Sequence, residues 1–182
     1  MRFYSGKGDK GTTTLYGSGK RALKTGKVFE LLGTLDELNS YLGICKSLAR
    51  DKKIKNALET IQENLFIIQA DVGSSGHPTS KQMSDVQAMK TEKILGLEKT
   101  IDKFGEALGI ITKFTLSGDS ALSAHLDYAR TLARSAERAY LASRTPNGYA
   151  LAYLNRLSSL LFVLARYVNK KAGKKERNPK YK

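Results

Sequence analysis

The chain has 182 residues, of which 41% are hydrophobic and 26% are charged, and its formal net charge is +14. This length suits one domain with a sizeable core, and the lack of a continuous apolar run of about 18 residues argues against a membrane span. The single cysteine, Cys45, excludes an internal disulfide, and with only two well-separated histidines, His77 and His125, it disfavours a zinc site.

The positive charge lies at the two ends of the chain. Residues 1–27 and 169–182 each carry seven Lys or Arg and one acidic residue, whereas residues 28–168 carry 17 basic and 15 acidic residues. We therefore expect a nearly neutral folded body, no nucleic-acid-binding face, and a disordered basic tail over 169–182. No signal peptide is visible after Met1, so with the unpaired cysteine we expect a cytoplasmic protein.

The N-terminal stretch 5–14 reads Ser-Gly-Lys-Gly-Asp-Lys-Gly-Thr-Thr-Thr. Closely spaced glycines, lysines and threonines are the chemistry of a polyphosphate-binding loop, although a solvated flexible tail has the same composition. The spacing matches G-x-G-x-x-G, but too few residues precede it for a buried strand, and Thr12 stands where a Walker A motif needs lysine. This predicts a phosphate loop of another kind, followed by a short extended piece around 13–16.

Beyond residue 27 the apolar residues recur at helical spacings of three and four. The pattern predicts an all-α, antiparallel five-helix bundle over 28–168 with mostly short connections. The expected helices cover about 28–49, 51–72, 87–105, 119–144 and 149–170, with a loop over 73–85 and with Ser117 or Asp119 as N-cap of the fourth helix. The first helix carries a second, polar stripe of Asp36, Asn39 and Gly43.

The fourth and fifth helices carry candidate binding residues. Arg130, Arg134, Glu137 and Arg138 share one helical face. They form either ordinary surface pairs or a site for a phosphate anion, since two arginines one turn apart repel unless an anion binds both. Asn155, if it lies in the bundle interior, needs a hydrogen-bond partner, either a nucleotide or a neighbouring helix.

Five motifs in order give a more specific signal. They are Tyr4-Ser-Gly-Lys-Gly-Asp-Lys-Gly-Thr-Thr13, Gly33-Thr-Leu-Asp-Glu-Leu-Asn-Ser40, Phe114-Thr-Leu-Ser-Gly118, His125-Leu-Asp-Tyr-Ala-Arg130 with Ala136-Glu-Arg138, and Leu154-Asn-Arg-Leu-Ser158 with Leu161-Phe162. Over about residues 4–168 the chain resembles the PduO-type ATP:corrinoid adenosyltransferases. The resemblance implies a homotrimer with active sites between subunits. It also implies that ATP, with Mg²⁺, donates its 5′-deoxyadenosyl group to the cobalt of cob(I)alamin or another reduced corrinoid and releases triphosphate.

The resemblance also implies roles for individual residues. The triphosphate would be bound by Ser5, Gly6, Lys7, Gly8, Asp9, Lys10, Gly11, Thr12, Thr13 and Lys24. Arg134 would neutralise phosphate charge, while Glu137 and Asn155 would hold the nucleotide and its metal. Asp36 and Arg130 would pair across the subunit boundary. Phe114 would press on the lower face of the corrin, keep the axial base away and leave the cobalt four-coordinate.

Three positions depart from the family pattern. Ser117-Gly118-Asp119 replaces Pro-Gly-Gly, Ser135 replaces a second arginine, and Ser159 replaces an aspartate. The last two suggest a charge pair lost together, and Asp119 suggests an altered corrinoid affinity. A carrier or sensor of ATP or adenosylcobalamin with weak turnover is the alternative function. A corrinoid reductase or an adenosylcobalamin-dependent enzyme is a possible partner.

Overall fold

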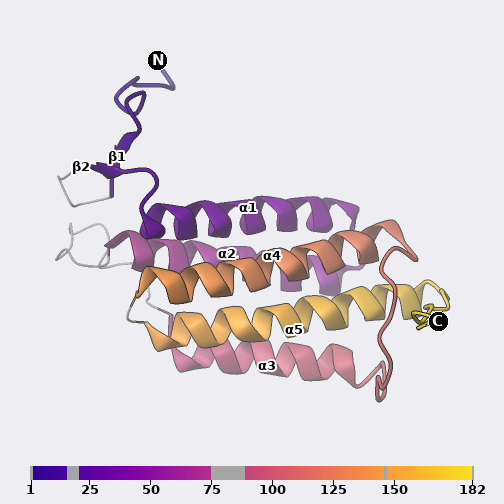
Figure 1. Cartoon of the computed structure of the whole chain (residues 1–182). Helices are drawn as coiled ribbons and strands as arrows, with labels where there is room; N and C mark the ends of the chain where they lie inside the picture. The colour runs from indigo at the N-terminus through magenta and orange to yellow at the C-terminus, as the bar shows by residue number, and fades with distance from the viewer. Residues whose placement is uncertain (1, 16–20, 75–88, 146, 182) are drawn as a thin grey trace.

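Five long helices make up most of the computed structural model, which describes residues 2–15, 21–74, 89–145 and 147–181. Successive helices alternate in direction (Figure 1), and this confirms the predicted all-α bundle. Helix α4 packs against α1 and α5, while α2 covers α1 and α3 covers α5. The bounds are α1 Lys27–Leu48, α2 Lys52–Ser74, α3 Thr91–Gly105, α4 Ala121–Ser143 and α5 Gly148–Lys171.

The core contains the apolar residues whose helical spacing predicted the bundle. Fully buried side chains come from the stripes of α1, α2 and α5, including Leu35, Leu42, Ile61, Leu65, Leu157 and Leu161. Inside this core the Asn64 Nδ2 group of α2 donates a 3.1 Å hydrogen bond to the Tyr153 hydroxyl of α5. The bond satisfies two buried polar groups that would otherwise destabilise the packed interior.

The polar stripe of α1 divides between two environments. Asn39 is buried, and its main-chain carbonyl accepts a 3.0 Å hydrogen bond from the side chain of Gln62 of α2. The same Gln62 side chain lies beside Gly43. Asp36 is exposed. Gln62 of α2 therefore lies against α1 between Asn39 and Gly43, whereas Asp36 is accessible at the surface.

Two predicted helix starts are wrong by a few residues. The N-cap of α4 is Ser120, whose Oγ accepts from the Ser123 amide and donates to Asn169 at 2.7 Å, rather than Ser117 or Asp119. Helix α3 begins at Thr91 rather than at about residue 87, so the buried Met89 precedes it. Asn147 caps α5 through the Tyr149 and Ala150 amides. Most of the predicted 73–85 loop, Tyr16 and Pro146 lie outside the described residues.

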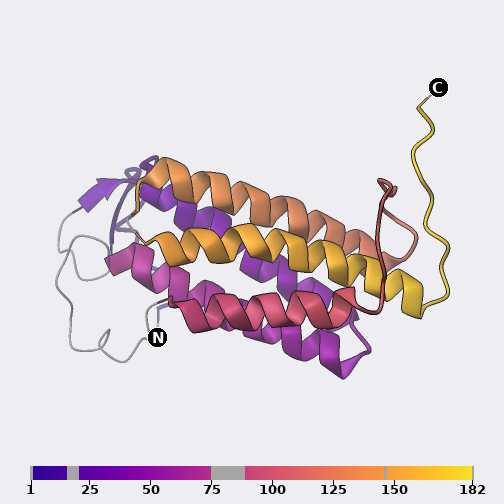
Figure 2. The ribbon, with the colours of Figure 1, turned by 90° about the horizontal axis from the view of Figure 1, so that it is seen from below.

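The connection between α3 and α4 is longer than the sequence suggested. Residues 106–120 have no helix or strand, and they cross the outside of α5 to reach α4 (Figure 2). Lys170 of α5 donates to the Ala107 carbonyl at 2.6 Å on this path. The crossing is required because α5 lies between α3 and α4, so the chain must pass α5 to reach the start of α4.

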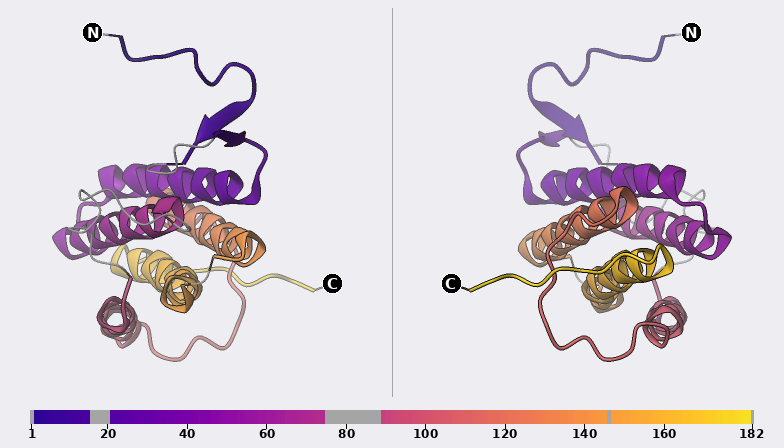
Figure 3. Two further views of the ribbon diagram at one scale, coloured as in Figure 1. Left: turned by 90° about the vertical axis from the view of Figure 1, so that its left-hand side faces the viewer. Right: turned by 90° about the vertical axis from the view of Figure 1, so that its right-hand side faces the viewer.

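A small hairpin precedes the bundle. Strand β1 Thr12–Thr14 pairs antiparallel with β2 Arg21–Leu23, with Thr12 opposite Leu23. The extended piece predicted around 13–16 corresponds to β1, whereas β2 was not predicted. Figure 3 shows the hairpin and the preceding residues standing away from the helices.

The tail, residues 172–181, differs from the disordered segment that we expected. Helix α5 continues to Lys171, beyond the expected end of the bundle at 168. The tail then runs beside the 114–119 connection, where the Leu116 amide donates to the Arg177 carbonyl at 2.8 Å. Figure 3 shows it crossing that connection before its last residues extend into solvent. Its high charge therefore does not prevent specific contacts.

Helix α5 is, among the described residues, the one helix long and apolar enough by length and composition to cross a membrane. It packs between α4 and α3, and its buried residues include Ser158, Arg166 and Asn169. These features are those of the central helix of a bundle, because a polar and charged buried face needs protein partners.

Candidate active site

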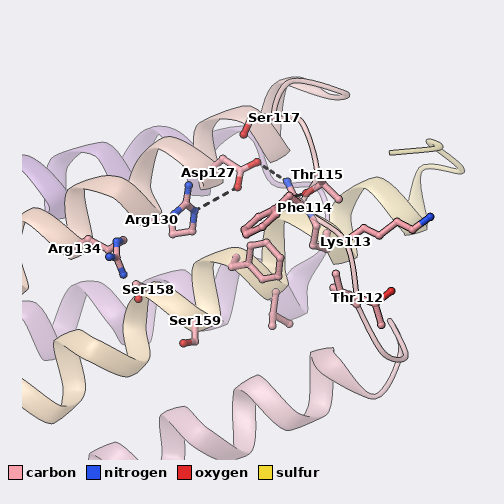
Figure 4. A pocket seen from close by; sticks show the side chains of 14 residues that line it. Thr112, Lys113, Phe114, Thr115, Ser117, Asp127, Arg130, Arg134, Ser158 and Ser159 are labelled. Atoms are coloured by element: carbon pink, nitrogen blue, oxygen red, sulfur yellow. Dashed lines mark hydrogen bonds and ion pairs between the residues drawn. The ribbon is translucent and has the colours of Figure 1, made fainter. Parts of the chain in front are cut away.

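An open cleft of about 700 Å³ lies where the 111–117 segment crosses α4 and α5 (Figure 4). Phe114 forms part of one wall, and its side chain is 79% exposed. Arg130 and Arg134 reach the cleft from α4. Ser158, Ser159, Phe162, Val163 and Arg166 line it from α5. The structure thus brings three of the predicted site residues to one cavity.

A buried ion-pair network supports this cleft. Arg166, 3% exposed, donates to Asp127 and to the Thr115 hydroxyl, and its guanidinium carbon lies 5.1 Å from the centroid of the Phe162 ring. Its Nε atom is 2.6 Å from Glu176 Oε1, without the alignment of a hydrogen bond. Removing one member of such a buried pair costs about 3–5 kcal/mol. No motif or spacing indicates this network, because its members lie far apart along the chain.

Arg130 has a partner within its own chain. Its Nε lies 3.6 Å from Asp127 Oδ1, a distance that gives an ion pair, and this Nε is buried without a hydrogen bond. Asp36 is on α1 and makes no ion pair with Arg130 in the described part of the chain. Asp36 and Arg130 therefore do not pair within the described part of one subunit. Their pairing across a subunit boundary stays a prediction.

Arg134 is an exposed cation that makes no hydrogen bond or ion pair with any residue of the described chain. The surface pair with Glu137 that the sequence allowed is not formed. Glu137 instead accepts a 2.8 Å hydrogen bond from the Asn155 amide, and Arg138 donates to Ser135 at 3.0 Å. Asn155 is exposed rather than interior, so both it and Arg134 are accessible to a ligand.

The N-terminal loop has the backbone of an anion-binding turn. Gly6 and Gly11 have φ values of 66° and 73°, in the left-handed region that glycine adopts without strain. The Asp9 amide donates to the Gly6 carbonyl at 3.2 Å, which closes the first turn. Lys24 Nζ would lie 3.0 Å from a Cβ placed on Gly8, so this ammonium group lies close beside the loop. The role of Lys24 as a further contact of the phosphate stays a prediction.

Arg21 is a site residue that the sequence reasoning missed. Its guanidinium donates to the Lys7 carbonyl at 2.5 Å and to the Thr12 carbonyl and hydroxyl at 2.7 Å each. It therefore ties strand β2 to both ends of the glycine loop. Arg21 comes seven residues after Thr14, the last of the clustered threonines, and this spacing matches no known motif. The hairpin register brings Arg21 beside the loop.

The loop and the α4 residues do not meet within one chain. None of the hydrogen bonds and ion pairs of the described loop residues reaches Arg134, Glu137 or Asn155, and the hairpin lies beyond the N-terminal end of α1 (Figure 1). The glycine loop and these residues of α4 and α5 are thus two separate groups of candidate ligands in the described structure.

Ser135 and Ser159, the two departures in α4 and α5, have different surroundings. The Ser135 hydroxyl donates to the Thr131 carbonyl of its own helix at 3.2 Å, while Ser159 is exposed on the cleft wall. A charge pair lost together from these positions stays a prediction.

The comparison with known proteins now identifies the family. Residues 3–168 match the family model described as cobalamin adenosyltransferase. The chain belongs to this family. The resemblance to PduO-type enzymes is confirmed, because corrinoid adenosyltransferase PduO of Salmonella typhimurium is 38% identical over 170 residues, 91% of this chain. A corrinoid adenosyltransferase of Citrobacter freundii is 36% identical over 168 residues, 91% of this chain and 93% of that protein.

Solved structures of the family match the whole bundle. A phenylalanine-to-alanine variant of the PduO-type ATP:corrinoid adenosyltransferase from Lactobacillus reuteri, complexed with cobalamin and ATP, has a TM-score of 0.86 at 30% identity. The match covers 98% of this chain and 99% of that one. The chain nevertheless spans about half (49%) of the length of the Salmonella PduO protein.

Proposed function

We propose that this chain transfers the 5′-deoxyadenosyl group of ATP to the cobalt of a reduced corrinoid, giving adenosylcobalamin and triphosphate. The observation that carries the proposal is the cleft that is lined both by an exposed aromatic ring, Phe114, and by Arg134, a cation without an ion-pair partner among the described residues. A flat apolar macrocycle suits the ring and an anionic phosphate suits the guanidinium. A site for ATP and corrinoid together needs both.

The nucleotide site would combine two subunits of a homotrimer. The glycine loop with Lys24 would supply amides and ammonium groups from one subunit, and Arg134, Glu137 and Asn155 would complete the site from the next. Asp36 and Arg130 would pair across the same boundary, where the buried, unbonded Nε of Arg130 offers a donor. This division is supported by the separation of the two groups within one chain.

Mg²⁺ would enter with ATP. The described residues contain no group of three acidic, histidine or cysteine side chains able to hold a metal alone. One carboxylate, Glu137, oriented by Asn155 at 2.8 Å, suits a Mg²⁺ ion that phosphate oxygens and water otherwise coordinate. The ion would add charge neutralisation to the leaving triphosphate.

The reaction needs the two substrates to be positioned and the charge of the leaving group to be stabilised, and it needs no protein nucleophile. Cobalt(I) donates its electron pair to C5′ while the bond from C5′ to the triphosphate oxygen breaks, and triphosphate leaves with that bond's electrons. Arg134 and the loop would stabilise the negative charge that develops on the leaving group. Phe114 would occupy the lower corrin face and exclude the axial base. Because the step consumes cobalt(I), a corrinoid reductase would act before it, and an adenosylcobalamin-dependent enzyme would use the product.

The free, buried Cys45 fits a reducing compartment, and we place the enzyme in the cytoplasm. The test is to add ATP, Mg²⁺ and reduced cobalamin to the purified chain and to follow the visible spectrum. Formation of the cobalt–carbon bond with one triphosphate released per bond supports the proposal. Tight ATP binding without that bond refutes it in favour of a carrier or sensor.

A further inference from the structure

Two consecutive tail residues, Arg177 and Asn178, contact the segment that carries Phe114, and Glu176 just before them contacts α5. We propose that Glu176, Arg177 and Asn178 are positioning residues that hold the Phe114 segment, residues 110–119, in place for the corrinoid. The inference rests on the proposed function for the identity of the ligand, while the contacts themselves belong to the structure. None of the three residues is expected to touch the reacting atoms.

The Phe114 segment cannot hold its own position. It has no helix or strand, and the side chains of Ile110 and Phe114 are 93% and 79% exposed, so packing restrains them little. Within the described chain, the one backbone hydrogen bond made by an amide of this segment is the 2.8 Å bond from Leu116 to the Arg177 carbonyl. An aromatic ring that displaces an axial base must be held in position, because the base could push a mobile ring off the corrin face at a small cost in free energy.

The tail supplies bonds on both sides of Thr115. The Asn178 side-chain amide donates to the Phe114 carbonyl at 2.7 Å, while Leu116 donates to the Arg177 carbonyl. The backbone at Phe114 and the backbone at Leu116 are thus both bonded to the tail, which fixes the direction in which the ring leaves the segment.

Charge reinforces this attachment. The Asp119 side chain is 10% exposed, and its Oδ1 atom lies 3.4 Å from Arg177 Nε. Its Oδ2 atom is buried without a hydrogen-bond partner. A mostly buried carboxylate is unfavourable without a nearby cation, so Arg177 explains how the segment tolerates aspartate where related motifs have glycine.

Glu176 connects the tail to the floor of the cleft. It lies 2.6 Å from Arg166 Nε and accepts a 2.8 Å hydrogen bond from Asn169. Arg166 in turn binds Asp127, which pairs with Arg130. The tail therefore contacts both the Phe114 segment and the buried ion-pair network, to which Thr115 of that segment is also bonded.

The test uses the full chain and four variants: Asn178→Ala, Arg177→Glu, Arg177→Lys, and a chain ending at Lys175. Lys180→Ala is the matched control, because Lys180 is exposed in the same tail and its side chain makes no interaction in the described structure. We would measure the Kd of cobalt(II) corrinoid with ATP bound, the fraction of cobalt in the four-coordinate state by electron paramagnetic resonance, the KM values for corrinoid and ATP, and the thermal midpoint.

Loss of one or two such contacts corresponds to a factor of about 5 to 30 in an equilibrium constant. We expect the corrinoid Kd and KM to rise by about that factor in Arg177→Glu and in the shortened chain, with a smaller four-coordinate fraction. Arg177→Lys should restore most of the loss, and the ATP KM should stay within about twofold.

Unchanged corrinoid binding and cobalt coordination in Asn178→Ala and Arg177→Glu would overturn the inference. Equal losses for ATP and corrinoid would also overturn it, because they indicate general destabilisation. If the shortened chain does not fold, the two exposed point substitutions decide. Absence of cobalt–carbon bond formation in the unsubstituted chain would refute the proposed function instead, and the cobalt(II) titration would still test the tail.

Discussion

Replacing Arg134 by alanine should weaken ATP binding strongly while leaving the fold intact. The side chain is exposed and unpaired in the described chain, so its removal breaks no internal contact, and the free energy of unfolding should change by less than about 0.5 kcal/mol. A hydrogen bond to a charged group contributes about 1.5–3 kcal/mol, which corresponds to about 10- to 150-fold in affinity. We therefore expect the Kd and KM for ATP to rise by that factor.

Arg138→Ala is the matched control for this substitution. Arg138 lies one turn further along α4, carries the same charge, is also exposed, and donates to Ser135 of its own helix. Both variants lower the net charge by one. A difference between their ATP affinities therefore reports the position of the arginine rather than the overall charge of the protein. Arg134→Lys should give an intermediate loss, because lysine keeps the charge without the planar two-pronged geometry.

The assay is isothermal titration with ATP and Mg²⁺, together with the initial rate of cobalt–carbon bond formation at saturating corrinoid and varied ATP. A nearly normal KM and turnover in Arg134→Ala would refute the role given to this residue. Equal losses in Arg134→Ala and Arg138→Ala would refute the geometric argument and leave only a charge effect.

Three other changes test separate parts of the structure. Phe114→Ala should reduce turnover more with corrinoids that carry a lower axial base than with cobinamide-like ones, since the ring is proposed to displace that base; equal losses in the two assays would contradict it. Arg21→Ala should raise the ATP KM about tenfold, because it removes the bonds to Lys7 and Thr12, whereas corrinoid binding to the separate cleft should not change; an unaltered ATP KM would show that the loop closes without Arg21. Burial disfavours the thiolate and raises the pKa of Cys45 to about 12. At pH 8 a thiol reagent should therefore react with Cys45 only after urea unfolds the chain. Fast reaction of the folded protein would show that the bundle opens around α1.

The sequence determined the architecture of the bundle because the information is local. Apolar residues at spacings of three and four define each helix, and the stripes of α1, α2 and α5 are the buried faces found in the structure. The glycine loop could also be recognised from its composition, since phosphate binding depends on exposed amides and on residues adjacent in the chain. Helix ends were less certain, as Ser120 shows, because several residues in a row can cap a helix.

Only the tertiary structure decided which distant residues act together. Arg166 contacts Thr115, Asp127 and Glu176 from three other segments, and no spacing in the sequence indicates such a group. The charge of the tail predicts disorder, yet the tail contacts the Phe114 segment, because Arg177 has a carboxylate partner in Asp119 and its carbonyl accepts from the Leu116 amide. The sequence alone specified the helices and the loop chemistry, whereas the geometry of the cleft depends on contacts that form only after the helices have packed.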